Sequence, residues 1–220
     1  MCNIPDNVLD AFDVMIDDYR SLLKIYYPAY KRTGFTERNL TFYFCKNLLS
    51  RLPARKQKPF VWMETPIRET KKHLDALVFS PENKSVFFIE AKRIKSPSKL
   101  KVIKEEIGRI NDNKDAIIVD DFINNNYNKY IIYLADIWPV SGSTENENKT
   151  TIYKNWKENK DSGIIEGTQW LNKLLPVDNM DDNDIAPNIE WQKITASESI
   201  FEDGLRDQYD YQLLLALGKL

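Results

Sequence analysis

The sequence predicts an α/β fold of three layers, in which helices cover a mixed β-sheet on both faces. Three observations lead to this prediction. Residues 6–27 and 36–52 place apolar side chains at helical spacing. Residues 72–95 form two apolar runs joined by the turn-forming segment SPENKS, as in a β-hairpin. A helical segment and another apolar strand follow, which gives the core order α-β-β-β-α-β.

The first two helices have clear boundaries in the sequence. Pro28 ends the first, Thr36 opens the second with Glu37 in its first turn, and Pro53 stops it. A basic loop, PARKQKP, then leads to FVWMETPI at residues 60–67, which we expect to be a strand.

The predicted hairpin contains the charged residues that are candidates for a functional site. If Phe79 faces Val86 across the turn, Asp75 faces Glu90, and Lys92 lies on the same face two residues further along. The two carboxylates would then have Cβ atoms roughly 5 Å apart on a sheet that is apolar on nearly both sides. Like charges so placed are destabilising unless Lys92 or a divalent cation such as Mg²⁺ or Mn²⁺ compensates them.

The rest of the chain is predicted to alternate helices, strands and loops. A helix begins near Ser98, and residues 115–121 either extend it or form a short strand. The segment NNNYNKY at 124–130 is a loop, and the strand YIIYLADIW at 130–138 follows it directly. Beyond it we expect short helices at 153–159 and 168–175, an edge strand at 188–195 and a final helix at 202–217. We treat 1–220 as one domain, with a core at 36–138 and a helical C-terminal extension at 140–220 that matches no motif.

Composition narrows the function class. Cys2 and Cys45 are too few for a disulfide framework, and no stretch is long and apolar enough to span a membrane, so we expect a cytoplasmic protein without membrane partners. The net charge of −2 conceals an asymmetry, since residues 31–110 hold 19 Lys/Arg against 8 Asp/Glu and the rest holds 12 against 25. A basic middle segment that contains a carboxylate cluster favours a polyanionic partner, although the same charges also suit solvated helix surfaces.

The segments HLD and FIEAK, with Asp75, Glu90 and Lys92, resemble the motif of the PD-(D/E)XK nuclease superfamily. The resemblance covers roughly residues 36–138, and Leu74 stands where the motif name has proline. It implies a restriction-endonuclease-like core and metal-dependent hydrolysis of phosphodiester bonds, usually in DNA.

The resemblance also implies roles for individual residues. Asp75, Glu90 and the Ala91 carbonyl would bind Mg²⁺ or Mn²⁺, Lys92 would orient or help deprotonate the attacking water, and Glu37 would add a helix carboxylate to the site. Basic residues that flank the motif are candidates for holding the nucleic-acid backbone: Arg93, Lys95, Lys99, Lys101 and Arg109. Many members of the superfamily are homodimers, which remains an option here.

Two other functions stay open at this stage. The first is a catalytically inactive module of the same fold that binds nucleic acid or a protein partner. The second is a metal-dependent hydrolase that acts on RNA or nucleotides. The five tryptophans are expected in the core rather than as base-stacking surfaces.

Overall fold

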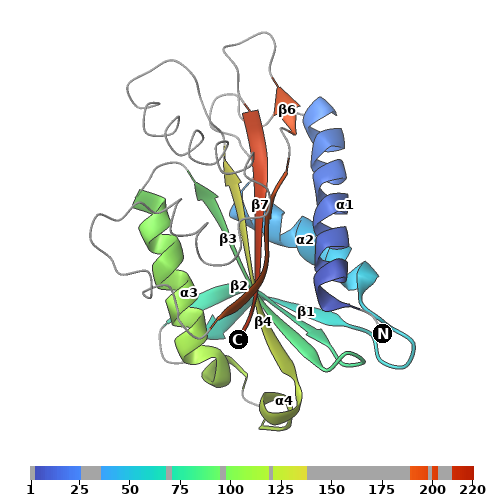
Figure 1. Ribbon diagram of the computed structural model, residues 1–220, viewed down its shortest axis with the longest axis vertical. Coiled ribbons are helices and arrows are strands. Elements are labelled where there is room, and N and C mark those ends of the chain that lie inside the picture. Colours follow the sequence, from blue (N-terminus) through green and yellow to red (C-terminus); the bar gives the residue numbers. More distant parts are fainter. Residues whose placement is uncertain are drawn as a thin grey trace.

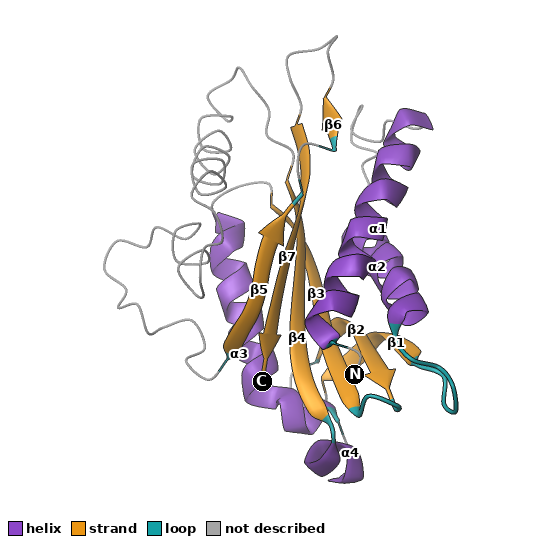
Figure 2. Ribbon diagram, turned by 45° about the vertical axis from the view of Figure 1, so that its right-hand side comes forward, coloured by secondary structure: helices purple, strands orange, loops and turns teal. Residues whose placement is uncertain are grey.

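The computed structural model describes residues 3–25, 36–67, 71–94, 98–118, 121–137, 189–197, 200–202 and 210–220. These residues form an α/β fold in three layers, with the sheet between helices (Figure 1). Two helices, α1 (Ile4–Ile25) and α2 (Glu37–Arg51), cover one face, and α3 (Ser98–Ile117) covers the other (Figure 2). None of the described helices is long and apolar enough to cross a membrane.

The sheet is mixed. Its strands are β1 (Phe60–Ile67), β2 (Lys72–Ser80), β3 (Ser85–Ile94), β4 (Asn128–Ile137), β5 (Glu190–Ala196), β6 (Phe201–Glu202) and β7 (Asp210–Lys219). Within the described residues the order is β1-β2-β3-β4-β7-β5, with β6 paired to β7. Only β3 and β4 run parallel among these pairs, because α3 and the short α4 (Asp121–Asn126) form the crossover between them.

The helices and hairpin predicted in the first half of the chain are confirmed. Thr36 is the N-cap of α2, where Asn39 completes a capping box. The predicted strand at 60–67 has the bounds of β1. The register of the hairpin is also as expected, with Phe79 opposite Val86.

The predicted C-terminal helix is wrong. Residues 210–219 form β7, which lies between β4 and β5. Leu213, Leu215 and Leu217 pack under α1 and α2, whereas Leu214 and Ala216 pack on the α3 side. A run that is apolar on both faces suits an interior strand as well as a buried helix, and its pairing with β4 decides between them.

Smaller differences concern the connections. Residues 115–117 extend α3, and part of the predicted loop forms α4. The predicted edge strand is confirmed as β5, at the far side of the sheet from β1. The predicted helices at 153–159 and 168–175 lie outside the described residues.

Each face of the sheet has its own core. Ala76, Val78 and Phe87 pack under α1 and α2, while Leu77 and Phe88 pack under α3, as the alternation of the hairpin predicts. Leu74 is an exception. Strict alternation would place it beside Ala76, but it belongs to the core under α3, because the regular strand pairing is interrupted at the intervening Asp75.

A buried ion pair joins β3 to β4 on the α1 side. Arg93 and Asp136 are register partners in the parallel pair, and Arg93 Nε lies 3.1 and 3.0 Å from the two carboxylate oxygens of Asp136. The Tyr211 hydroxyl donates to the same carboxylate at 3.0 Å. Asp136 is fully buried, so its charge depends on these donors for compensation.

We expect Arg93→Ala to lower the free energy of unfolding by about 3–5 kcal/mol, because it leaves the buried Asp136 carboxylate without its cation. Urea denaturation would measure the loss. Arg20→Ala, which removes an exposed partner of Asp17, is the control and should cost under about 1 kcal/mol. The double variant Arg93→Met/Asp136→Leu should recover much of the loss, and a double variant as unstable as Arg93→Ala would contradict this account.

Candidate active site

The candidate site lies where β2 and β3 stop pairing regularly. Their paired residues end at Ala76 opposite Ile89, and the next positions are Asp75 and Glu90. At these positions, side-chain carboxylates accept the hydrogen bonds of the backbone N–H groups of the opposite strand. The Ala91 N–H donates to Asp75 Oδ2 at 2.7 Å, and the Asp75 N–H donates to Glu90 Oε2 at 3.3 Å. Each carboxylate therefore accepts a backbone hydrogen bond from the opposite strand, and we call this point the fork.

The pairing of β1 with β2 is also irregular here. Glu64 has a φ of 53° and is skipped in the pairing, and its charge is close enough to Asp75 to raise the pKa of that carboxyl. A positive φ is costly for a residue with a side chain. Arg38 on α2 forms an ion pair with Glu64 at 3.2 Å.

Lys92 is surrounded by three carboxylates from three different elements. Its Nζ lies 2.9 Å from Glu106 on α3, 3.8 Å from Glu37 on α2 and 4.0 Å from Glu90 on its own strand. Of the three contacts, that with Glu106 is the shortest and the one within hydrogen-bond distance.

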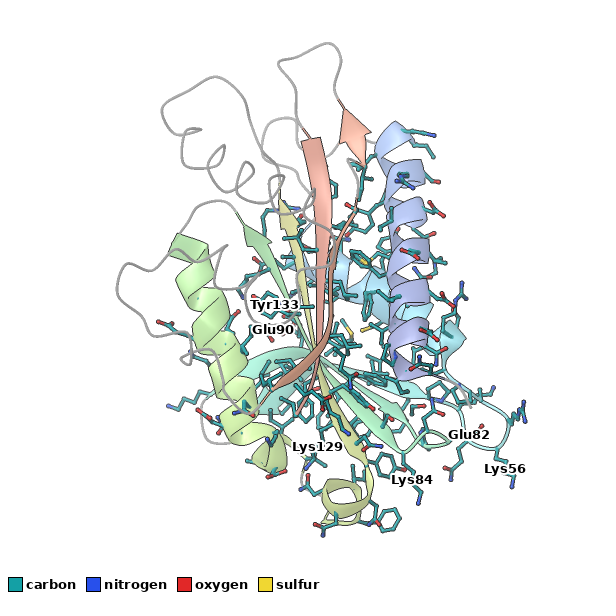
Figure 3. The ribbon with its side chains drawn as sticks, in the orientation of Figure 1. Lys56, Glu82, Lys84, Glu90, Lys129 and Tyr133 are labelled. Atoms are coloured by element: carbon teal, nitrogen blue, oxygen red, sulfur yellow. The ribbon has the colours of Figure 1, made fainter. Side chains whose placement is uncertain are left out.

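Glu106 is in turn held by Tyr133. The Tyr133 hydroxyl donates to Glu106 Oε2 at 3.1 Å, while Oε1 of the same carboxylate faces Lys92. Tyr133 is the register partner of Glu90 across the parallel pair β3–β4, and both labelled side chains lie between the sheet and α3 (Figure 3). Through these two contacts, the Lys92 ammonium is linked to Glu106 on α3 and, through Glu106, to Tyr133 on β4.

Arg109 supplies the second cation of the site. Its Nη2 lies 3.5 Å from Glu90 Oε1, at the limit of a hydrogen bond. Its Nε is buried and has no hydrogen-bond partner among the described residues. A buried guanidinium N–H without a partner is costly, and an anionic ligand would satisfy it.

Burial dominates the electrostatics of the two strand carboxylates. Desolvation, together with the charges of Asp75 and Glu106, raises the pKa of Glu90 to about 8, although Lys92 and Arg109 act in the opposite direction. Desolvation also raises the pKa of Asp75, despite its bond from the Ala91 N–H. Burial disfavours the charged Lys92, but the hydrogen bond and charge of Glu106 outweigh it and raise the pKa of Lys92.

The structure thus brings together four residues singled out from the sequence: Asp75, Glu90, Lys92 and Glu37. Glu106 was missed. The available signal was its helical spacing to Arg109 and Ile110, which places a carboxylate on the covered side of α3.

The proposed backbone-binding residues are placed differently from what the sequence suggests. Arg93 and Arg109 point inward, to Asp136 and Glu90 respectively. Lys95 and the side chains of Lys99 and Lys101 lie outside what the structure describes.

The donor chemistry of the fork fits a hard divalent cation. Four carboxylates, from Asp75, Glu90, Glu106 and Glu37, lie around Lys92, and Arg109 contacts one of them, Glu90. Oxygen ligands in excess over cations are what Mg²⁺ and Mn²⁺ require. In the side-chain conformers present, protein donors occupy these carboxylates, and no three His, Cys, Asp or Glu residues in the described part of the chain form a metal-holding group.

Comparison of the chain with protein-family models, with curated proteins and with solved structures finds no match. The function proposed below therefore depends on the geometry and chemistry of the fork.

We expect the metal-free protein to lose stability as the pH rises from about 4.5 to about 8. Across this window the unfolded chain releases the Glu90 proton, whereas the folded chain, with a pKa of about 8, retains it. Glu90→Gln removes the titrating carboxyl group. The free energy of unfolding of this variant should therefore fall less between pH 5 and pH 8 than that of the unmodified chain.

Urea denaturation at the two pH values, with a chelator present, tests this expectation. Glu105→Gln, which alters an exposed neighbour on α3, should behave like the unmodified chain. Equal pH dependence in Glu90→Gln and the unmodified chain would show that Glu90 titrates normally.

Proposed function

We propose that this protein is a metal-dependent nuclease of the PD-(D/E)XK type, with a restriction-endonuclease-like core, that hydrolyses phosphodiester bonds in DNA. The observation that carries the proposal is the meeting of Asp75, Glu90 and Lys92 at the fork, with Glu37 beside them. The order α2, β1, β2, β3, α3, β4, with β4 parallel to β3, supports the same core.

Each residue of the fork has a role in this reaction. Asp75 and Glu90 would hold Mg²⁺ or Mn²⁺, with the Ala91 carbonyl and Glu37 as further oxygen donors. The cation, when bound, would neutralise charge on the carboxylates and on the phosphate. Lys92 would orient the attacking water and stabilise negative charge that develops on the phosphate oxygens.

Arg109 supports phosphate binding at the same point. Its buried Nε–H meets no protein acceptor among the described residues, and guanidinium groups favour phosphate oxygens as acceptors.

One observation favours a second candidate, an inactive module that keeps the fold and binds nucleic acid. Lys92 and Arg109 already compensate Glu90 within the protein, so the cluster also makes sense as a structural ion-pair network. The two functions differ in their need for metal, because the nuclease requires Mg²⁺ or Mn²⁺ and the binding module does not.

We expect cleavage of plasmid or oligonucleotide DNA in the presence of Mg²⁺ or Mn²⁺ that Asp75→Asn and Lys92→Met each reduce by about 10²–10⁴-fold. Asp115→Asn, which alters an exposed carboxylate paired with Lys129, is the control and should leave the rate unchanged. Mg²⁺ should also raise the Tm of the unmodified chain and not that of Asp75→Asn.

The alternative predicts different results. If varied DNA and RNA substrates remain intact, Mg²⁺ leaves the Tm unchanged, and DNA binding is salt-sensitive but insensitive to chelator, the nuclease proposal is wrong and the binding module is supported.

Glu106 should act as a positioning residue for Lys92. We expect Glu106→Gln to lower kcat by about 10-fold with little change in KM, because the ammonium loses its nearest carboxylate. Tyr133→Phe should have a smaller effect in the same direction. Steady-state kinetics with Glu105→Gln as the matched control checks this, and equal kcat values for the two glutamine variants would contradict the role.

A further inference from the structure

The edge strand β1 exposes two aromatic side chains on the α3 side of the sheet. Phe60 and Trp62 are each 52% exposed, although the sequence suggested that the tryptophans belong to the core. Phe60 stacks on Phe79, with ring centroids 4.7 Å apart, and Phe79 belongs to the core under α3. Trp62 lies on the same face as Phe60, because side chains alternate along a strand and the intervening Val61 packs toward the other core.

This aromatic pair leads toward the candidate active site. Trp62 is the register partner of Leu77, which shares its core with Phe88 under α3. Two residues further along β1, about 7 Å, Glu64 lies beside Asp75. An extended ligand that lies along β1 from these rings would therefore reach the fork, whose lysine meets carboxylates from both the α2 and the α3 side of the sheet.

The approach to β1 is strongly basic. The loop at 53–59 exposes Arg55, Lys56 and Lys58, and residues 53–63 contain no acidic side chain. Glu82, in the turn between β2 and β3, accepts hydrogen bonds from the Lys56 and Gln57 N–H groups, the latter at 3.2 Å. Figure 3 shows Glu82 and Lys56 close together at this end of the hairpin. The loop backbone is therefore held in place while its cations face solvent.

The edge itself is poorly suited to pair with another β-strand. Pro66 has no N–H to donate, and Glu64 interrupts the strand with its positive φ. The Thr65 hydroxyl also donates to the Trp62 carbonyl at 2.8 Å. That carbonyl therefore already accepts a hydrogen bond from within β1. These features disfavour strand addition by a second copy of the chain. The exposed aromatic rings are therefore better suited to a ligand that binds through its own flat rings.

We propose that Phe60, Trp62 and the basic residues of loop 53–59, together the β1 surface, bind an unpaired strand of nucleic acid, so that the substrate of the fork carries a single-stranded segment. Aromatic rings stack on exposed bases, and a basic track holds the phosphates. Bases inside a duplex are already stacked on one another and present no free faces to Trp62. This proposal rests on the proposed nuclease function in one respect, that the bound strand is cleaved at the fork. Binding itself can be measured without cleavage.

The test is fluorescence anisotropy with a labelled oligothymidine and with a duplex of equal length, in the presence of a chelator. We expect tighter binding of the single strand, weakened about 5- to 100-fold by Trp62→Ala and largely retained in Trp62→Phe. Phe122→Ala, which removes another exposed aromatic ring on α4, is the matched control and should change nothing. Oligouridine in place of oligothymidine shows whether the strand is RNA or DNA.

A second measurement concerns the basic loop and does not involve Trp62. Neutralising Arg55, Lys56 and Lys58 should reduce the slope of log K against log salt concentration by about 0.7 for each phosphate that the loop no longer neutralises. All three side chains are exposed, so the folded structure should tolerate the changes.

The outcomes separate this proposal from the nuclease proposal. Trp62-dependent binding of the single strand in chelator, with no cleavage when Mg²⁺ or Mn²⁺ is then added, supports the β1 surface and overturns the nuclease. Cleavage that requires Asp75 but is indifferent to Trp62→Ala, with equal binding of single strand and duplex, overturns the β1 surface alone. A dimer in sedimentation that Trp62→Ala dissociates would also overturn it, since the surface would then be a self-interface.

Discussion

The structure depends on an imbalance of charge at the point where β2 and β3 stop pairing. Asp75 and Glu90 are held close together by their backbone hydrogen bonds, in surroundings that disfavour both charges. The protein compensates them in part with Lys92 and Arg109, while Glu106 and Glu37 add further negative charge. Burial, together with the remaining excess of carboxylate, raises the pKa of Glu90, and in our proposal the same excess would attract a divalent cation.

The two cores meet at the end of β3. Lys92 points toward α3 and its carboxylates, and the adjacent Arg93 points the other way, to the buried Asp136. Glu37 links the two sides, because one of its oxygens accepts the Arg93 N–H at 3.0 Å and the other lies 3.8 Å from Lys92 Nζ. The position of the candidate catalytic lysine therefore depends on packing beneath α1 and α2 as well as beneath α3.

The fork and the β1 surface form one continuous arrangement in the proposed function. The basic loop precedes β1, the exposed rings of Phe60 and Trp62 follow, and Glu64 leads to Asp75. Phosphate attraction, base stacking and hydrolysis would then occur in sequence on a path from the β1 edge to the ends of β2 and β3. In the proposed function, this arrangement would account for the large aromatic side chains that the strand edge exposes.

The sequence by itself determined the local features: the start of α2 at Thr36, the bounds of β1, and the hairpin register that places Asp75 near Glu90. These follow from turn chemistry, capping and alternation, which act between residues close in the chain. Tertiary structure alone decided that residues 210–219 form a strand, that Glu106 and Tyr133 hold Lys92, and that Trp62 is exposed. An apolar run such as Leu213–Leu217 fits a buried helix or an interior strand equally well, and only the neighbouring β4, distant in sequence, supplies the hydrogen bonds that select between them.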